Sequence, residues 1–455
     1  MAYSGASAAI LSNYAEILKT LYLPAMREQL NQGTPLSDLI ETNQVDISGK
    51  NATINMHYGR NKGIGARKDG GALPDADYQK TKTATVPTKY NYGRVTFSGP
   101  TIAATRDERG AYARVIDNEI TGIVRDLQKD INRQYWGCGY GIVGRWLTGA
   151  AGTQTWQKKY RGNSVGGDGF GSTFGGKYVK EISGAVTVVL GSYSSGWPIT
   201  VDTTDIAVSA VVESANYDTI TCTNPSLTEA AGTYFIRPAS SQTDDAGVAG
   251  AARFEMMGLR GIVTDEDIDE IGIFNGTYSG LKTNDPLQGL AVATYPWFTA
   301  NMSKHSSGRY AGQRALTLNL MQTMFDKVEE KAGKDVGPNV ILTTRAIRRE
   351  YLDLMQADRR NVNTMVLDGG WKALDYNGIP LMVDDDAIDG EMYFLTTSDI
   401  QQYRMSDYDW MDRDGAVLAR ISGYDAYEAV LFIYAELGCS RRNTQGVICD
   451  LAYEL

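Results

Sequence analysis

The chain has 455 residues, of which 42% are hydrophobic and 22% are charged, and its formal net charge at pH 7 is −10. This composition excludes a wholly disordered chain, and the length predicts about two to four structural units. The acidic balance argues against a protein that binds DNA through a basic face and counterion release.

The first predicted element is an amphipathic helix over residues 7–31. Its apolar residues from Ile10 to Leu21 follow helical spacing, and Pro24 breaks or kinks it. Because a single apolar stripe has no partner layer of its own, we interpret this segment as an arm rather than a domain.

A long hairpin is predicted next, from strand-like residues at 51–58 and 81–97. Between them, GRNKGIGARKDGGALP at 59–74 is rich in glycine and basic residues, which predicts a wide, mobile tip. Such a hairpin is not stable alone in water and needs a surface to lie on.

The charges of the hairpin contrast with those of a later segment. Residues 50–94 contain nine Lys or Arg and three Asp, whereas residues 384–430 contain twelve Asp or Glu and three Arg. Two interpretations fit these charges. Either both segments are solvated surfaces, or the basic hairpin reaches over the acidic surface of a neighbouring copy. The hairpin candidates for that contact are Arg60, Lys62, Arg67 and Lys68.

The clearest helix is predicted over residues 109–136, with one continuous apolar stripe and Gly137 as its stop. Short strands separated by turns follow in the Gly-, Ser- and Thr-rich residues 148–255, which predicts an inserted all-β domain. From residue 256 a mixed pattern returns, and the chain as a whole is predicted to be α+β.

The mixed segment opens with a turn and strand at MMGLRGIVTD. A helix over 314–332, a strand at NVILTT (339–344) and a Thr-capped helix at RAIRREYLDLMQ follow. Strands are predicted at NGIPLMVDDD and GEMYFLTTSDI, and EAVLFIYAELG and GVICDL are expected to pair with each other at the end of the chain.

Targeting and membrane signals are not evident. MAYSGASAAILSNYAE lacks the basic segment and apolar run of a signal peptide, and AVLFIYA at 429–435 is shorter than the roughly 20 residues of a membrane span. The four cysteines form no CxxC pair, which predicts free thiols in a reducing cytoplasm: Cys138, Cys222, Cys439 and Cys449.

Catalytic signals are scarce. His57 and His305 are the two histidines, and we expect structural or solvated roles for both. GNSVG at 162–166 lacks the flanking strand and helix of a nucleophile elbow, and GCGYG at 137–141 follows a helix rather than a strand. We therefore predict no enzyme activity, no catalytic residue and no cofactor.

Two acidic runs remain, DEDIDE at 265–270 and DDDAID at 384–389. Neither has the spacing of an EF-hand loop, so we predict no metal site and interpret them as solvated faces or subunit contacts. In the second run the contact candidates are Asp384, Asp385 and Asp386. A carboxylate-based hydrolase stays open, because carboxylate geometry is not contained in a sequence.

The ordered set of these segments resembles a known family. It comprises an arm with YLPAMREQL, the basic hairpin, a helix ending DINRQYW, then GLRGIV, NVILTT, NGIPLMVDDDAIDGEMYFL and EAVLFIYAELGCSRRNTQGVI. It resembles the major capsid proteins of tailed bacteriophages, which have the Hong Kong 97 type capsid fold. The resemblance covers nearly the whole chain apart from residues 148–255.

The resemblance implies a division of the chain. Its parts are an N-terminal arm (1–50), an extended hairpin loop (51–98), a peripheral domain with the spine helix (99–147), the β-rich insertion (148–255), a peripheral return and connector (256–309), an axial domain (310–428) and C-terminal peripheral strands (429–455). Some family members cross-link a hairpin Lys to a neighbour's Asn, but Lys62, Lys68, Lys80 and Lys82 match no motif for this.

The resemblance also implies a structural function. The protein would assemble as hexamers and pentamers into an icosahedral head shell that encloses double-stranded DNA without sequence-specific binding. Its partners would be further copies, a scaffolding protein, a portal and a decoration protein, with no membrane. It would be found in the virion, and in the host cytoplasm during assembly.

Three alternatives stay open beside this interpretation. An encapsulin-type compartment shell would have the same fold and would hold a cargo enzyme. A carboxylate-based hydrolase would show turnover that is lost when a carboxylate is replaced. A secreted or adhesive β-rich protein would need a secretion signal, which the sequence does not show.

Overall fold

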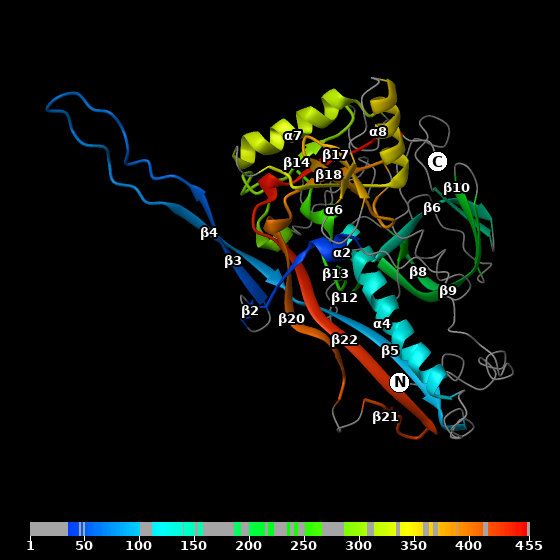
Figure 1. Cartoon of the computed structure of the whole chain (residues 1–455). Helices are drawn as coiled ribbons and strands as arrows, with labels where there is room; N and C mark the ends of the chain where they lie inside the picture. Colours follow the sequence, from blue (N-terminus) through cyan, green and yellow to red (C-terminus); the bar gives the residue numbers. More distant parts are fainter. Residues whose placement is uncertain are drawn as a thin grey trace.

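The structure is a computed structural model of the 455-residue chain (Figure 1). It describes residues 35–44, 47–48, 51–100, 112–139, 141–150, 153–157, 186–192, 200–213, 217–222, 234–236, 241–243, 251–265, 286–306, 314–333, 337–357, 364–366, 372–388, 390–412 and 417–452. The predicted arm helix at 7–31, the GNSVG string and residues 266–270 lie outside these ranges.

The described chain begins with helix α2 (Pro35–Leu39) and strands β1 (Glu41–Asn43) and β2 (Ile47–Ser48). The predicted hairpin is present as β3 (Asn51–Gly59) and β4 (Lys80–Pro87), joined by residues 60–79. It projects far from the rest of the molecule (Figure 1). Strands β2, β3 and β4 form a three-stranded sheet.

The second hairpin strand is shorter than predicted. After Pro87 and Thr88 the chain continues as β5 (Lys89–Ser98), which pairs along its length with β22 (Ala426–Cys439) rather than with β3. The expected hairpin of 51–98 therefore spans two sheets. Pro87 lacks an N–H for a ladder, which fits the end of a strand.

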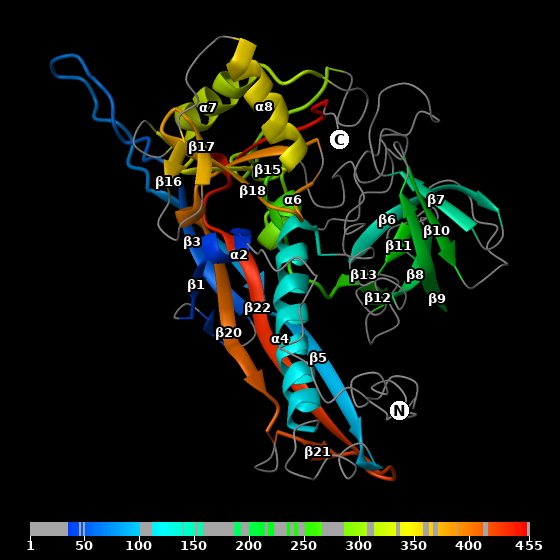
Figure 2. The ribbon, with the colours of Figure 1, turned by 45° about the vertical axis from the view of Figure 1, so that its right-hand side comes forward.

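A long five-stranded sheet contains β5 and β22 together with β1, β20 (Ile400–Trp410) and β21 (Ala419–Arg420). In β22 Ala429, Leu431 and Ile433 are buried, and the residues between them are half-buried. This period of two means that one face of the sheet is covered. Helix α4 lies along that face (Figure 2).

Helix α4 (Tyr112–Trp136) confirms the strongest helix prediction. Leu127 and Ile131 pack in the same core as Leu431 and Ile433. The helix approaches β5 closely where Gly93 leaves space, since a Cβ there would lie 3.0 Å from Ile123 Cγ1. The residues of its last two turns from 130 to 136 are all buried.

The second main sheet has seven strands in the order β14-β23-β19-β15-β18-β17-β16. Helices α7 (Leu318–Ala332) and α8 (Arg345–Ala357) pack on it through a second apolar core. The strands are β14 (Asn301–Ser303), β15 (Val340–Thr343), β16 (Thr364–Val366), β17 (Lys372–Tyr376), β18 (Ile379–Val383), β19 (Met392–Leu395) and β23 (Gly446–Ile448).

Three expectations for the second half of the chain are wrong. Strands β22 and β23 do not pair, because β22 lies in the long sheet and β23 lies between β14 and β19. The segment GLRGIV forms helix α6 (Leu259–Ile262) instead of a strand. The hydroxyl of Thr344 makes no hydrogen bond, so it does not cap α8.

The chain passes between the two main sheets at a different place from the boundary expected at residue 428. Strand β20 pairs with β22 from Ile400 onward, so the chain leaves the seven-stranded sheet near residue 399 and returns to it at β23. All three residues of β23 are buried, which is typical of a strand covered on both faces, whereas β22 alternates between buried and half-buried residues over 429–435. Short 3-10 turns lie at Leu287–Gly289, Thr397–Asp399 and Arg442–Thr444.

The described elements of the insertion are all strands, as predicted. Six described strands close into a barrel in the order β10-β7-β6-β11-β8-β9, which leaves no open sheet edge. The barrel starts at residue 142, earlier than the expected boundary at 148. Its strands, with the separate pair β12 and β13, are β6 (Ile142–Ala150), β7 (Thr153–Gln157), β8 (Val186–Ser192), β9 (Thr200–Glu213), β10 (Tyr217–Cys222), β11 (Tyr234–Ile236), β12 (Ser241–Thr243) and β13 (Ala251–Arg253).

Candidate inter-subunit contact surfaces

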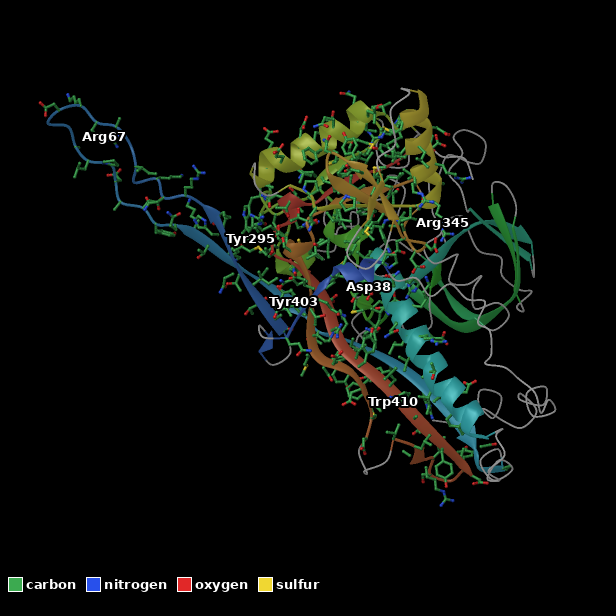
Figure 3. The ribbon with its side chains drawn as sticks, viewed as in Figure 1. Asp38, Arg67, Tyr295, Arg345, Tyr403 and Trp410 are labelled. Carbon is green, nitrogen blue, oxygen red and sulfur yellow. The ribbon has the colours of Figure 1, made fainter. Side chains whose placement is uncertain are left out.

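The hairpin tip, residues 60–79, is held in shape by hydrogen bonds between its own residues. Asn61 Nδ2 donates to the backbone oxygen of Asp77 across the tip at 2.6 Å. Arg67 Nε donates to the backbone oxygen of Ala72 at 3.0 Å. The tip therefore has internal structure although it stands away from the two main sheets (Figure 3).

The surface of the tip combines positive charge with apolar side chains. All four basic candidates, Arg60, Lys62, Arg67 and Lys68, are exposed. Three large apolar side chains are exposed beside them: Ile64 (78%), Leu73 (84%) and Tyr78 (73%). Single exposed apolar residues are ordinary, whereas several on one projecting segment are typical of surfaces that contact a partner.

The three acidic candidates lie at the end of β18, and they contact their own chain. The carboxylate of Asp384 accepts hydrogen bonds from the backbone N–H groups of Leu36 in α2 (3.3 Å) and Asp386 (2.8 Å). Asn132 Nδ2 of α4 donates to both Asp384 (3.4 Å) and Asp386 (2.7 Å). These residues thus join α2, α4 and the seven-stranded sheet.

Two of these candidates therefore need correction. Asp384 is fully buried, so no neighbouring hairpin reaches it. The side chain of Asp386 is 6% exposed and forms an ion pair with Lys129 Nζ of α4 at 3.1 Å. Asp385 pairs with the exposed Arg345 at 2.9 Å and stays a predicted contact residue.

Burial governs the chemistry of Asp384. The loss of solvent, and after it the charge of Asp386, raise its pKa from 3.8 to about 6. The hydrogen bonds from Asp386 N and Asn132 act in the opposite direction. A raised pKa is also typical of catalytic acids, but this carboxyl has no exposed surface for a substrate.

We predict a pH-dependent effect of Asp384→Asn. In the folded chain the carboxyl holds its proton up to about pH 6, whereas its usual value is 3.8. Protonation hence stabilises the folded state, and this contribution of roughly 3 kcal/mol is present below pH 3.8 and is lost as the pH rises through 6. As pH falls from 7 to 4, unfolding experiments should show the wild type gaining stability relative to the variant.

The matched control is Asp385→Asn, one residue away on the surface. Its difference from the wild type should change by less than about 1 kcal/mol over the same pH range, as for an exposed ion pair. If Asp384→Asn gave a difference as flat as that control, the buried carboxyl would not be coupled to folding.

The face of the long sheet opposite α4 carries an aromatic cluster that sequence reasoning missed. Tyr434 of β22 contacts Tyr90 and Tyr92 of β5 edge-to-face, with ring centroids 5.1 and 6.0 Å apart, and lies 4.8 Å from Phe432. Tyr90 and Tyr92 are about half exposed. The alternation in KYNYGRVTF at 89–97 was the available signal for this face.

Acidic side chains follow the same sheet from the level of the aromatic cluster, where Asp409 pairs with Phe432, to the end near β21. The exposed ones are Asp407, Asp409, Asp412 and Asp425, which we call the acidic end. It lies at the opposite end of the molecule from the hairpin tip (Figure 1). The residues of the expected acidic surface over 384–430 therefore lie in two separate places: a mostly buried junction at 384–386 and the exposed acidic end.

Other candidates take ordinary places within the described residues. His57 forms a 2.7 Å hydrogen bond with Gln79, and His305 N donates to Asp450. Cys138, Cys439 and Cys449 are buried free thiols. In the described ranges no group of three His, Cys, Asp or Glu is placed to hold a metal ion, and no described helix is long and apolar enough to span a membrane.

Comparison with known proteins adds evidence on the fold. The sequence matches no protein-family model and no curated protein. The solved structures that it resembles include the cyanophage A-1(L) capsid asymmetric unit, with 14% identity, TM-score 0.54, and coverage of 96% of this chain and 98% of that chain.

Two further resemblances have lower scores. One is to the holo-SrpI encapsulin complex from Synechococcus elongatus PCC 7942 (8% identity, TM-score 0.45, 98% of this chain and 99% of that chain). The other is to the capsid of Myoviridae phage XM1 (7% identity, TM-score 0.42, 96% of this chain and 98% of that chain). The likeness to the cyanophage capsid spans almost the whole of both chains, and at 14% identity it is a likeness of fold alone. This chain therefore has the Hong Kong 97 type capsid fold.

Proposed function

We propose that the protein is the major capsid protein of a tailed phage, a structural subunit that assembles as hexamers and pentamers into the icosahedral head around double-stranded DNA. The observation that carries the proposal is the projecting hairpin on a capsid fold. Its tip exposes Arg60, Lys62, Arg67 and Lys68 together with large apolar side chains, on a segment that stands away from its own chain.

The partner of the tip, in this proposal, is the long sheet of the next copy. That sheet offers an aromatic face at Tyr90, Tyr92 and Tyr434, with the acidic end beside and beyond it. Apolar tip residues fit the first surface and basic tip residues fit the second. Since hairpin and acidic end lie at opposite ends of the molecule, the contact is head-to-tail, and repeated head-to-tail contacts close into rings.

The energies fit a shell built from many weak contacts. An exposed ion pair contributes only about 0–1 kcal/mol, so one hairpin binds its neighbour weakly. Repetition over every subunit of a closed shell makes the sum large, because each subunit is held by several neighbours at once. Weak single contacts also let misplaced subunits dissociate before the shell closes.

Other parts of the proposal concern location and partners. The subunit belongs to the virion and passes through the host cytoplasm during assembly. A scaffolding protein, a portal and a decoration protein are the partners that a head of this kind uses. The net charge of −10 suits a container that does not grip its DNA.

An encapsulin-type compartment would use the same fold and the same contacts, so the content of the particles decides between the two. The experiment is to express the protein alone and with a candidate scaffold, then to examine the product by sedimentation and electron microscopy. Closed shells, tubes or capsomer-sized rings are expected. A stable monomer under both conditions would overturn the shell proposal, and particles filled with a cargo enzyme would favour the compartment.

A further inference from the structure

The base of the hairpin carries an aromatic contact that neither the core nor the tip explains. Tyr58, the last large residue of β3, stacks on Trp297 with ring centroids 4.8 Å apart and planes 4° from parallel. Across the hairpin, Lys82 Nζ of β4 lies 5.1 Å from the ring centroid of Tyr295. We call Tyr58, Lys82, Tyr295 and Trp297 the aromatic clamp; Tyr295 lies at the hairpin base in Figure 3.

The clamp lies where the hairpin leaves the molecule. The inward side chains nearer the sheet, Met56 and Ala84, are buried in the main core with Leu287 and Leu290. Tyr58 continues the face of Met56 beyond the edge of that core and is 41% exposed. Past Gly59, the hydrogen bonds that shape the tip join tip residues to each other.

The strand geometry changes at the same point. The ladder between β3 and β4 runs regularly up to His57, which pairs with Thr81, and then shifts so that Gly59 pairs with Lys80. Tyr58 is the extra residue of this bulge. A bulge bends a strand and increases its twist, so the direction of the tip is decided here.

The other side of the clamp is fixed to the core. Trp297 contacts Phe298 edge-to-face at 5.7 Å, and Phe298 is 1% exposed. The guanidinium of the buried Arg442 lies 5.4 Å from the ring of Phe298 and donates to its backbone oxygen at 2.9 Å. A parallel stack against a fixed ring resists rotation of Tyr58, since it loses contact area when the planes tilt.

We propose that the aromatic clamp sets the direction in which the hairpin projects, and thereby the geometry of contact with the next copy of the chain. This consequence for assembly rests on the proposed function. A hairpin arm of about ten residues is roughly 30 Å long, so a rotation of about 10° at its base moves the tip by about 5 Å. A shift of that size separates charged partners that must meet within a few ångströms.

The test measures the hairpin direction in the unassembled protein. Spin labels are placed at Ala66→Cys on the tip and Glu330→Cys on α7, in a Cys222→Ser background, since three other cysteines are buried. Pulsed electron paramagnetic resonance then gives the distance between the labels. The unsubstituted clamp should give one narrow distribution, and Trp297→Ala should give a broader or shifted one. Trp297→Phe, which keeps a ring for stacking, should preserve the narrow one.

Tyr58→Ala covers the case in which Trp297→Ala fails to fold, because Tyr58 is exposed and its loss leaves the core intact. Narrow, unshifted distributions in Tyr58→Ala and Trp297→Ala would overturn the clamp, whatever the protein assembles into. If the distributions broaden, both alanine variants should also give irregular or open particles where the Trp297→Phe variant gives regular ones. Regular particles from variants with broadened distributions would overturn the link between clamp and assembly.

Discussion

Replacing Arg60, Lys62, Arg67 and Lys68 together by Glu should abolish shell assembly while leaving both apolar cores of the subunit folded, although it removes the hydrogen bond from Arg67 Nε to Ala72 within the tip. All four side chains are exposed on the tip, away from both apolar cores, so the melting temperature of the unassembled protein should not fall. Turning about four weak attractions into repulsions costs about 4 kcal/mol per contact, roughly a thousandfold in association. Sedimentation of the assembly products measures the loss.

A charge-swap variant supplies the control for this experiment. Asp409→Lys, Asp412→Lys and Asp425→Lys reverse three of the four charges of the acidic end and leave Asp407 in its ion pair with Arg404. They should restore assembly when combined with the four Glu substitutions. High salt should weaken wild-type assembly in the same direction, because exposed charges are screened. Regular particles from the four-Glu variant alone would show that the tip charges do not contribute to assembly. Failure of the swap to rescue would point to a different acidic partner.

Replacing Arg442 by Met should be the most destabilising single substitution considered for this chain. The Arg442 side chain is fully buried and donates to the backbone oxygens of Ile262 (2.8 Å) and Thr264 (2.9 Å), as well as to that of Phe298. Methionine fills a similar volume but leaves the carbonyls of Ile262 and Phe298 without this donor, while the Thr264 oxygen keeps only the N–H of Ala300 at 3.1 Å. Each such loss costs about 1–3 kcal/mol, so the free energy of unfolding should fall by about 4 kcal/mol or more.

Urea unfolding of the unassembled protein measures this change. The neighbouring Arg441 is a matched control, since it is 43% exposed and forms an ion pair with Asp399 at 3.1 Å. Arg441→Ala should cost less than about 1 kcal/mol. Equal effects of the two substitutions would show that Arg442 does not hold the 261–264 and 298 segments together.

The elements that could be predicted from the sequence are those whose apolar periodicity or turn residues lie within one short segment. The helix expected from the 3.6-residue period of α4 appears as predicted. The helix predicted over 314–332 is present as α7 but begins only at Leu318, with Thr317 Oγ1 accepting from Leu320 N as its cap. The hairpin strands and the all-β insertion were also predictable from alternation and turn residues. The resemblance to capsid proteins predicted the fold that the cyanophage capsid shares.

Two errors are local: GLRGIV forms a helix, and Thr344 does not cap α8. The other errors concern which strands meet, since that is decided by contacts far apart in the sequence. The apolar run of β22 gives no indication that its partners are β20 and β5 rather than β23. Similarly, DDDAID looks like a surface run, although Asp384 is buried by α2 and by Asn132 on α4. One signal was present in the sequence. The polar residues of DINRQYW lie on all sides of the helix, which indicates a helix end that is buried and whose polar side chains form hydrogen bonds on every side.

The most direct test of the account is an electron cryomicroscopy map of the assembled particle at side-chain resolution. The account predicts that the tip of each hairpin, residues 60–79, lies over the long sheet of an adjacent copy, with basic side chains near Asp409, Asp412 and Asp425. A map in which the hairpins fold back on their own chain, or lie over another surface of the neighbour, would contradict it.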